Sequence, residues 1–297
     1  MSKIKYSFTA ALLCLHFVSS AQFDFTTAEL ELAYQCDIMV NADEAKHRVV
    51  AHNSFLTRIT EVLKLDKSFE YPFDSLKWIS KKYPIDKSFR IFTWEIKVSD
   101  AEYLYFGFIQ MADGRLYKLE DHFKEAESVI DEEFTTDTWL GSLYYNLMDV
   151  RTENDQTYYL LFGVNRWSKY ENRKLVDVLF FTKEKIPVFG KPVFRNAEKG
   201  EADVFYNRLV FTYAADGQMT VNYNPGMEMI MYDNLIPKMS RIPGYGETMV
   251  PDGSYVGYAF DKKYWNKVDK IATEIMETAP RPNPILDQRK GKKIFGN

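Results

Sequence analysis

The sequence has only two cysteines among its 297 residues, Cys14 and Cys36. Cys14 falls in a leader segment that we expect to be removed, so one cysteine remains. A single cysteine cannot form an internal disulfide, which excludes the crosslinked scaffolds typical of small secreted proteins. The hydrophobic core alone must hold the fold, and a chain of this length buries about three-quarters of its surface, which is enough.

Motifs with catalytic or metal-binding spacing are also scarce. His47 and His52 are five residues apart, whereas a helical zinc pair is four apart. Glu44 and His47 have the spacing of a carboxylate-bridged metal centre, but such a centre needs this pair twice. No G-x-S-x-G motif accompanies His122, and Cys36 has no C-x-x-C partner. We therefore predict no metal site, no cofactor and no catalytic residue from the motifs.

A positive charge excess and a second long apolar run are absent as well. The formal net charge is −4, whereas nucleic-acid binding calls for a basic face. Beyond the leader, no stretch approaches the roughly 20 apolar residues that cross a bilayer. We therefore expect no nucleic-acid partner and no transmembrane segment after the leader has been cleaved.

The first 21 residues have the pattern of a secretory signal peptide. Lys3 and Lys5 give a positive start, residues 8–18 are mostly apolar, and residues 19–21 are small, as a cleavage site requires. Cleavage would make Gln22 the first residue and, since two lysines leave, change the net charge from −4 to −6. The pattern predicts an exported protein, and we favour the periplasm over the extracellular space because no C-terminal sorting domain is evident.

Residues 22–87 are predicted to form a helical N-terminal segment. Apolar residues recur at threes and fours through much of 26–65, as in an amphipathic helix. A third, short helix is expected over 74–82, with a polar cap at its start and Pro84 beyond its end.

Residues 88–270 have the pattern of a large antiparallel β-domain. Runs of aromatic and branched residues alternate with turn signals, and Asp113-Gly114 and Asp216-Gly217 are typical of hairpins. Strand–helix–strand alternation is absent, which argues against a nucleotide-binding parallel sheet. Within this domain we expect a short helix over 119–130 and a loop over 236–254. The expected strands are 89–98, 103–111, 115–119, 140–150, 157–164, 174–182, 187–194, 204–214, 219–223, 227–232, 255–260 and 264–268. Apolar residues at 268, 271, 272, 275 and 276 also fit a helix period, so a helix at this end stays open.

The predicted fold class is therefore α+β, with the helical segment packed on an antiparallel meander. The strand pattern leaves a barrel, a sandwich and a propeller-like arrangement open. Residues 271–297 alternate prolines with polar residues and then carry a cluster of lysines and arginines, so we expect a mobile basic tail.

A set of short motifs between residues 71 and 264 carries a family resemblance. The motifs are Tyr71-Pro72-Phe73-Asp74-Ser75-Leu76, Phe89-Arg90-Ile91-Phe92-Thr93-Trp94, Phe106-Gly107-Phe108-Ile109-Gln110, Tyr158-Tyr159-Leu160-Leu161-Phe162-Gly163, Lys174-Leu175-Val176-Asp177-Val178-Leu179, Gly190-Lys191-Pro192-Val193-Phe194, Arg208-Leu209-Val210-Phe211-Thr212-Tyr213, Tyr232-Asp233-Asn234-Leu235-Ile236-Pro237 and Pro251-Asp252-Gly253-Ser254-Tyr255. In this order they resemble a family of uncharacterised exported proteins of Bacteroidetes. The resemblance implies export and common ancestry, favours a strand over 264–268, and implies no activity, since the family has none assigned.

Aromatic side chains on two expected loops are the candidate binding residues. Trp167 and Tyr170 lie between two strands, and Tyr245 lies in the longest loop. Tryptophan and tyrosine on loops can stack on the faces of sugars or anchor a protein partner. Loop aromatics also commonly fold back over the edge of a sheet, which would give them a structural role.

Three functions are compatible with these patterns. The first is a non-enzymatic envelope or secreted binding protein, whose partner would be a glycan or an envelope protein. The second is a glycan-directed hydrolase, because its two carboxylates are paired in space and need no sequence motif. The third is a structural component of an envelope assembly.

Overall fold

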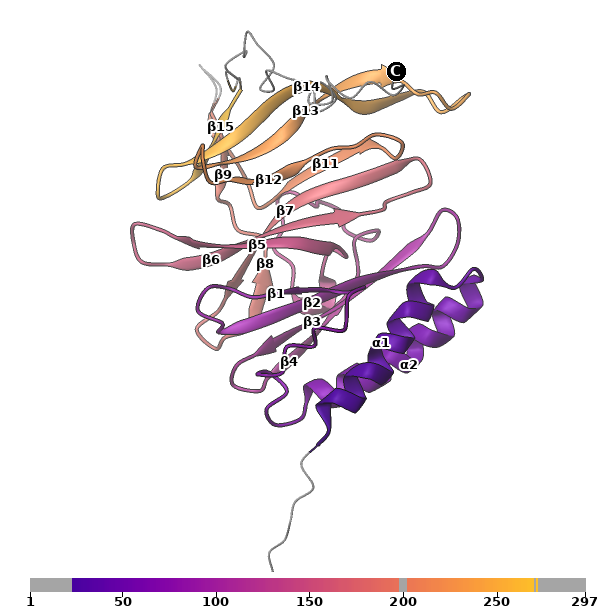
Figure 1. Cartoon of the computed structure of the whole chain (residues 1–297). Coiled ribbons are helices and arrows are strands. Elements are labelled where there is room, and N and C mark those ends of the chain that lie inside the picture. Colours follow the sequence, from indigo (N-terminus) through magenta and orange to yellow (C-terminus); the bar gives the residue numbers. More distant parts are fainter. Residues whose placement is uncertain (1–22, 198–201, 270, 272–297) are drawn as a thin grey trace, which may run out of the picture.

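The computed structural model describes residues 23–197, 202–269 and 271, which form two helices, one short 3-10 helix and fifteen strands (Figure 1). The predicted signal peptide, residues 1–21, and all but the first residue of the predicted basic tail lie outside this description. None of the helices in the described part of the chain has the length and apolar character needed to cross a membrane. In chain order the elements are α1 (Phe25–Asn41), α2 (Ala45–Leu63), β1 (Ser80–Lys82), β2 (Phe89–Lys97), β3 (Tyr103–Met111), β4 (Leu116–Glu120), η1 (Thr136–Thr138), β5 (Leu143–Arg151), β6 (Thr157–Asn165), β7 (Glu171–Phe181), β8 (Pro187–Phe189), β9 (Phe194–Asn196), β10 (Val204–Tyr206), β11 (Leu209–Ala214), β12 (Val221–Asn224), β13 (Met229–Met239), β14 (Glu247–Phe260) and β15 (Trp265–Val268).

The strands form three stacked sheets, and the two helices lie beside the first of them (Figure 1). The first sheet has the order β1-β2-β3-β4, the middle sheet β11-β7-β6-β5 with β8 beside β7, and the third sheet β10-β9-β15-β14-β13-β12. Among the described strand pairs, only β15 and β9 run parallel. The predicted α+β fold, with helices over a mostly antiparallel β-domain, is confirmed. Each described sheet has two free ends, so this domain is a stack of open sheets and not a closed barrel.

Side-chain alternation along the strands explains why the sheets stack. Successive residues of a strand point to opposite faces, and the middle sheet is apolar on both. In β6, Tyr159 and Leu161 join the core that faces the first sheet, whereas Leu160 and Phe162 join the core that faces the third. The middle sheet is therefore covered on both sides, which is why its strands read as nearly continuous apolar runs.

The helices are held by the outer core of the first sheet. Asp24 caps α1, because its carboxylate accepts hydrogen bonds from the backbone amides of Thr26 and Thr27. Phe55 of α2 packs edge-on against Trp94 of β2 at 5.2 Å between ring centres. This core buries a face of each helix against β2 and β3; its fully buried members include Ala28, Leu32, Cys36, Met39, Phe55, Ile59, Phe92 and Trp94.

The short helix expected over 74–82 is wrong. Residues 74–79 form turns, and Ser80–Lys82 form β1, which pairs with β2. The cause is long-range pairing: Ser80 and Lys82 are partners of Thr93 and Ile91 in β2, so this segment joins the first sheet. The carboxylate of Glu29 in α1 also accepts a hydrogen bond from the backbone amide of Ser75 at 2.5 Å, which fixes the turn before β1.

The helix expected over 119–130 is also wrong, because β4 continues to Glu120 and the following residues form turns. Asp121 instead bridges to Trp139, and the backbone amide of His122 donates to the carbonyl of Trp139 at 2.8 Å. Pairing with a distant segment therefore replaces the local hydrogen bonds that a helix would make.

The loop expected over 236–254 is largely a hairpin. β13 continues to Met239 and β14 begins at Glu247, and these ends pair only with each other. They project beyond the neighbouring strands, so each behaves as an edge strand, where proline is tolerated because no amide is needed on the open side. Pro237 and Pro251 both lie in this projecting part.

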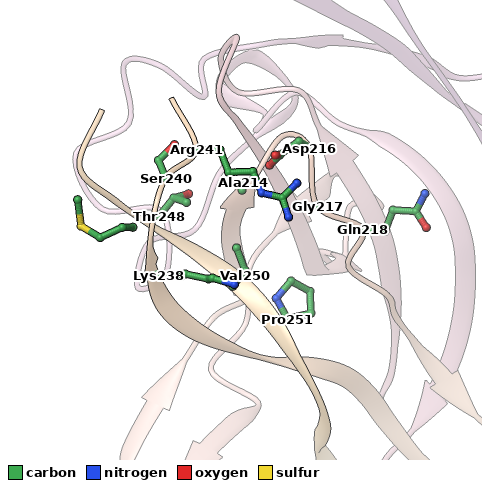
Figure 2. A pocket seen from close by; sticks show the side chains of 11 residues that line it. Ala214, Asp216, Gly217, Gln218, Lys238, Ser240, Arg241, Thr248, Val250 and Pro251 are labelled. Atoms are coloured by element: carbon green, nitrogen blue, oxygen red, sulfur yellow. The ribbon is translucent and has the colours of Figure 1, made fainter. Parts of the chain in front are cut away.

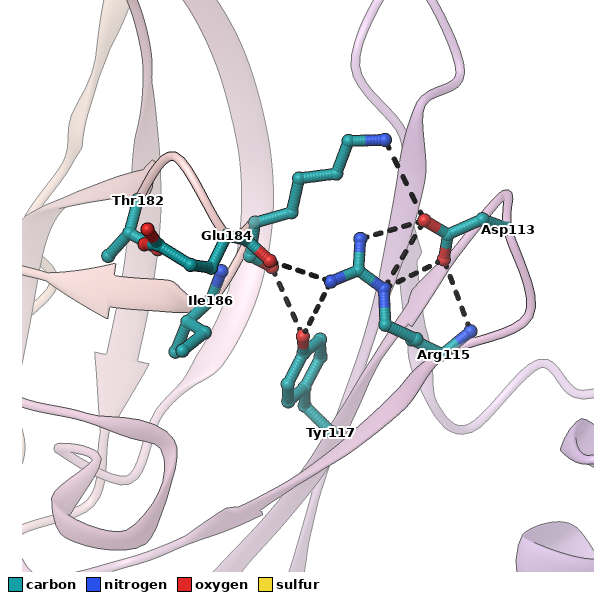
Figure 3. Close-up of polar contacts among 7 residues, drawn as sticks. Asp113, Arg115, Tyr117, Thr182, Glu184 and Ile186 are labelled. Atoms are coloured by element: carbon teal, nitrogen blue, oxygen red, sulfur yellow. Dashed lines mark hydrogen bonds and ion pairs between the residues drawn. The ribbon is translucent and has the colours of Figure 1, made fainter.

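A polar cluster ties the first sheet to the middle sheet, and we call it the Arg115 junction (Figure 3). Arg115 contacts Asp113 at 2.7 Å and donates to the carbonyl of Glu184 at 2.8 Å. Tyr117 donates to the carbonyl of Lys185, whose amine lies 3.7 Å from Asp113. The turn after β3 is thereby fixed to the turn between β7 and β8.

Candidate functional site

Three turns from the middle and third sheets converge at one end of the molecule. They are the β6–β7 turn (residues 166–170), the β11–β12 turn (residues 215–220) and the β13–β14 loop (residues 240–246). The backbone amide of Ala215 donates to the carbonyl of Tyr170 at 2.8 Å, which joins the first two turns. The rings of Tyr170 and Tyr245 lie 4.9 Å apart, which joins the first turn to the third.

A bulge in the β13–β14 hairpin and a hydrogen-bonded carboxylate at its base set the direction in which the hairpin projects. The register of the two strands shifts between Asp233 and Leu235, and such a bulge bends a strand and increases its twist. The buried carboxylate of Asp233 accepts hydrogen bonds from the Thr220 amide at 2.6 Å and the Thr220 hydroxyl at 2.9 Å. Strand β13 is thus fixed to the β11–β12 turn at the base of the hairpin.

Above this anchor the hairpin and the β11–β12 turn enclose a cavity of about 360 Å³, which we call the hairpin cleft (Figure 2). The turn forms one wall and the two strands of the hairpin form the other. A volume of this size is at the lower end of the range for small-molecule sites. The lining residues are Ala214, Asp216, Gly217, Gln218, Lys238, Met239, Ser240, Arg241, Thr248, Val250 and Pro251.

Several polar side chains of the cleft have no partner among the described residues, although the Ser240 hydroxyl accepts a hydrogen bond from the amide of Ile242 at 3.1 Å. Thr248 is 7% exposed, and its hydroxyl forms no hydrogen bond within the described chain. Lys238 lies directly opposite Thr248 in the hairpin, so the two side chains share a face. Neither Lys238 nor Arg241 takes part in any ion pair among the described residues. Of the described residues that line the cleft, only Asp216 is acidic.

Two of the three predicted binding residues meet beside this cleft. Tyr170 and Tyr245 are half-buried, and their rings are tilted by 59°. Burial and the carboxylate of Glu171 raise the pKa of Tyr245 above its ordinary value, so the phenol stays protonated and can donate a hydrogen bond. The contact was not foreseen, because the two residues lie on turns of different sheets.

Trp167 packs away from this pair. The guanidinium of Arg173 lies 3.3 Å from the centre of its ring, and Phe123 packs against it at 5.3 Å. Half-buried against the core between the first and middle sheets, Trp167 has one face covered by Arg173. The structure therefore brings Tyr170 and Tyr245 together at the cleft and gives Trp167 a packing role.

The histidines and the cysteine lie apart from the cleft. Burial lowers the pKa of His52 to about 4 and raises the pKa of Cys36 to about 12, so the imidazole is neutral and the thiol protonated at neutral pH. His47 and His122 are exposed. Within residues 23–197, 202–269 and 271, no group of three histidine, cysteine or acidic side chains is placed to hold a metal ion.

A second cavity, of about 630 Å³, lies beside the first sheet. It is lined by Phe69, Glu70, Pro72, Asp74, Lys81, Tyr83 and Lys87. Both carboxylates of this cavity, Glu70 and Asp74, are on exposed residues, whereas a glycosidase needs a carboxyl group that burial keeps protonated.

No family model, curated protein or solved structure matches this chain. The function is therefore inferred from the geometry of the site.

Proposed function

We propose that this chain is an exported, non-enzymatic binding protein that holds a glycan of the cell envelope in the hairpin cleft. The observation that carries the proposal is the convergence of three turns on one cavity, with the Tyr170–Tyr245 pair beside it. Loops held by a rigid scaffold are where binding sites concentrate, and here each turn is fixed by strand pairing or by the Asp233 anchor.

A glycan fits this cleft better than a protein partner does. Protein interfaces are centred on a packed apolar patch with aromatic anchors. The cleft is instead hollow and lined by hydroxyl, amide and charged side chains, including Ser240, Gln218 and Arg241. Sugars present hydroxyls to such groups and their apolar ring faces to tyrosine.

Binding fits the cleft better than hydrolysis, because hydrolysis of a glycosidic bond uses two carboxyl groups on opposite sides of that bond. Asp216 is the single acid among the described lining residues. A glycan hydrolase is the second candidate function, and it would use the cavity lined by the two carboxylates Glu70 and Asp74. If that candidate were correct, the mature chain would release reducing sugar from a glycan, and Asp74→Asn would abolish the release.

The proposal is tested by screening the mature chain, from Gln22 onward, on a glycan array and measuring affinity for the glycans retained. We expect Tyr245→Ala to weaken binding about tenfold, since a stacked aromatic contributes on the order of 1–3 kcal/mol. Tyr255→Ala is the matched control, because Tyr255 is an exposed tyrosine of β14 that belongs to none of the three converging turns. Equal affinity of the two variants, or an array without any bound glycan, would contradict the proposal.

A further inference from the structure

We infer that the ligand of the hairpin cleft is an acidic glycan, and that Arg241 and Lys238 bind its anionic group while the Thr248 hydroxyl donates a hydrogen bond to it. The inference rests on the proposed function and adds the chemical class of the ligand. The anionic group would be the carboxylate of a uronic acid or a sulfate ester, which present similar oxygens to these donors.

The first argument is that Arg241 differs from the other described arginines, each of which forms an ion pair or a hydrogen bond, as Arg195 does with Asp203 at 2.7 Å. Lys238 resembles several other exposed lysines that form no ion pair, and it adds a second positive charge beside Arg241. In the cleft, Arg241 and Lys238 face one carboxylate, Asp216, and form no ion pair with it or with any other described residue. The described lining therefore carries one net positive charge in a chain whose net charge is −4, and an anion is the ligand that such a site attracts.

The second argument is independent of charge and comes from Thr248. A buried hydroxyl without a hydrogen bond costs free energy, and native proteins leave few of them unpartnered. Thr248 is nine-tenths buried and lines the cleft on the same face of β14 as Val250. Its hydroxyl has no hydrogen-bond partner among the described residues.

The geometry of the hairpin brings the cations and the hydroxyl to one side of the cleft. Lys238 and Thr248 are cross-strand partners, so their side chains leave the hairpin on the same face. Arg241 extends from the loop above them toward the β11–β12 turn (Figure 2). The planar guanidinium can form two parallel hydrogen bonds with a carboxylate, which also fixes the orientation of the sugar that bears it.

Tyr170 and Tyr245 complete the site on the loop side. The β13–β14 loop that carries Arg241 also carries Tyr245, and the amide of Tyr245 donates to the carbonyl of Ile242 at 3.2 Å, which keeps this loop folded. When the anionic group of one sugar contacts Arg241, the adjacent sugars of the same glycan therefore lie near the Tyr170–Tyr245 pair. This explains why a glycan and not a free inorganic anion is the expected ligand.

The test is a calorimetric titration of the mature chain with trigalacturonic acid, its carboxyl-reduced neutral trisaccharide, a sulfated trisaccharide and inorganic sulfate. We expect an anionic trisaccharide to bind at least about tenfold more tightly than the neutral one, with the difference shrinking as salt is added. Whichever of the uronate and the sulfate ester binds more tightly identifies the anionic group. Arg241→Gln should weaken this binding about 10- to 100-fold, and Lys238→Met and Thr248→Val each by a smaller factor.

Lys183→Met is the matched control, because Lys183 is an exposed lysine of the β7–β8 turn outside the cleft. Equal binding of the neutral and anionic trisaccharides, with Tyr245→Ala still weakening both, would overturn the acidic ligand and leave the proposed function standing. Failure of every trisaccharide to bind, with inorganic sulfate still dependent on Arg241, would overturn glycan binding and keep an anion site. Equal effects of Arg241→Gln and Lys183→Met would overturn the assignment of Arg241.

Discussion

The Arg115 junction and the hairpin cleft are built from the same kinds of residue but differ in how their charges are satisfied. Each lies where turns of two stacked sheets meet, and each contains an arginine, a lysine and an aspartate. In the junction, Asp113 contacts both Arg115 and Lys185. In the cleft, Arg241 and Lys238 form no ion pair among the described residues. The satisfied cluster holds two sheets together, whereas the unsatisfied one is free to bind a ligand.

The electrostatics of the junction agree with this reading. Hydrogen bonds from Arg115 hold the pKa of the Asp113 carboxyl down at about 2. A carboxylate with a depressed pKa stabilises the fold above its unfolded value of 3.8, and this contribution is lost as the pH falls from 3.8 toward 2. The junction is exposed, so we expect the effect on overall stability to be small.

The largest expected effect on stability concerns His52, a buried residue with an unpartnered polar atom that lies outside the cleft. We expect such an atom to affect folding and not ligand binding. His52 is buried with its Nε2 unpaired in the described chain, and its ring lies 3.9 Å from that of Phe106. The folded pKa of about 4 lies below the ordinary 6.5, so between these values the unfolded chain binds the proton first. Stability should be full above pH 6.5 and fall by on the order of 3 kcal/mol toward pH 4.

This loss is measured by urea unfolding of the mature chain at a series of pH values. His52→Phe should flatten the curve between pH 6.5 and 4, because the phenylalanine cannot take up a proton. The expected glycan affinity of this variant is unchanged, since His52 belongs to α2, which packs on the first sheet, whereas the cleft is built from turns of the middle and third sheets. A curve as steep as that of the native chain would show that another group causes the acid sensitivity.

The next largest effect on stability comes from two threonine substitutions. They compare a hydroxyl that is hydrogen-bonded within the protein with one that has no described partner. Thr220→Val removes a 2.9 Å hydrogen bond to the buried carboxylate of Asp233, and we expect the free energy of unfolding to fall by about 1–2 kcal/mol. Thr248→Val removes a hydroxyl without a described partner, so stability should stay within about 0.5 kcal/mol of native or rise. Urea unfolding measures both, and an equal loss in the two variants would mean that Thr248 has a structural partner.

The smallest stability effect compares the two arginines directly. Arg115→Gln breaks contacts with Asp113 and the carbonyl of Glu184, which should lower the free energy of unfolding slightly, because the pair is exposed, without changing glycan affinity. Arg241→Gln should do the reverse, weakening the glycan and leaving stability unchanged. Thermal unfolding and calorimetry of both variants check this; a stability loss in Arg241→Gln equal to that in Arg115→Gln would erase the distinction between the two regions.

The sequence predicted those parts of the fold that depend on local patterns. The strands over 103–111 and 157–164 agree with β3 and β6 to within a residue, because their apolar runs are flanked by clear turns. The helix expected over 74–82 failed because Ser80–Lys82 pair with β2, a contact that the local sequence pattern does not report. The projecting end of the β13–β14 hairpin was missed because its prolines are tolerated only where the strands lack outer neighbours.

The candidate site was predicted in part. Tyr170 and Tyr245 were identified because aromatic residues on loops are common in binding sites, but their contact depends on how two sheets stack. Lys238, Arg241 and Thr248 were missed entirely. No sequence pattern reports that a cation lacks a carboxylate partner or that a hydroxyl is buried without one, since both are properties of the assembled fold.

The most direct test of the account is to follow the backbone amides of the isotopically labelled mature chain by nuclear magnetic resonance during titration with trigalacturonic acid. We expect shifts that saturate together at Gly217, Ser240 and Thr248 and leave the amides of the Arg115 junction in place. Shifts centred on the cavity at Lys81, or none at the hairpin cleft, would contradict it.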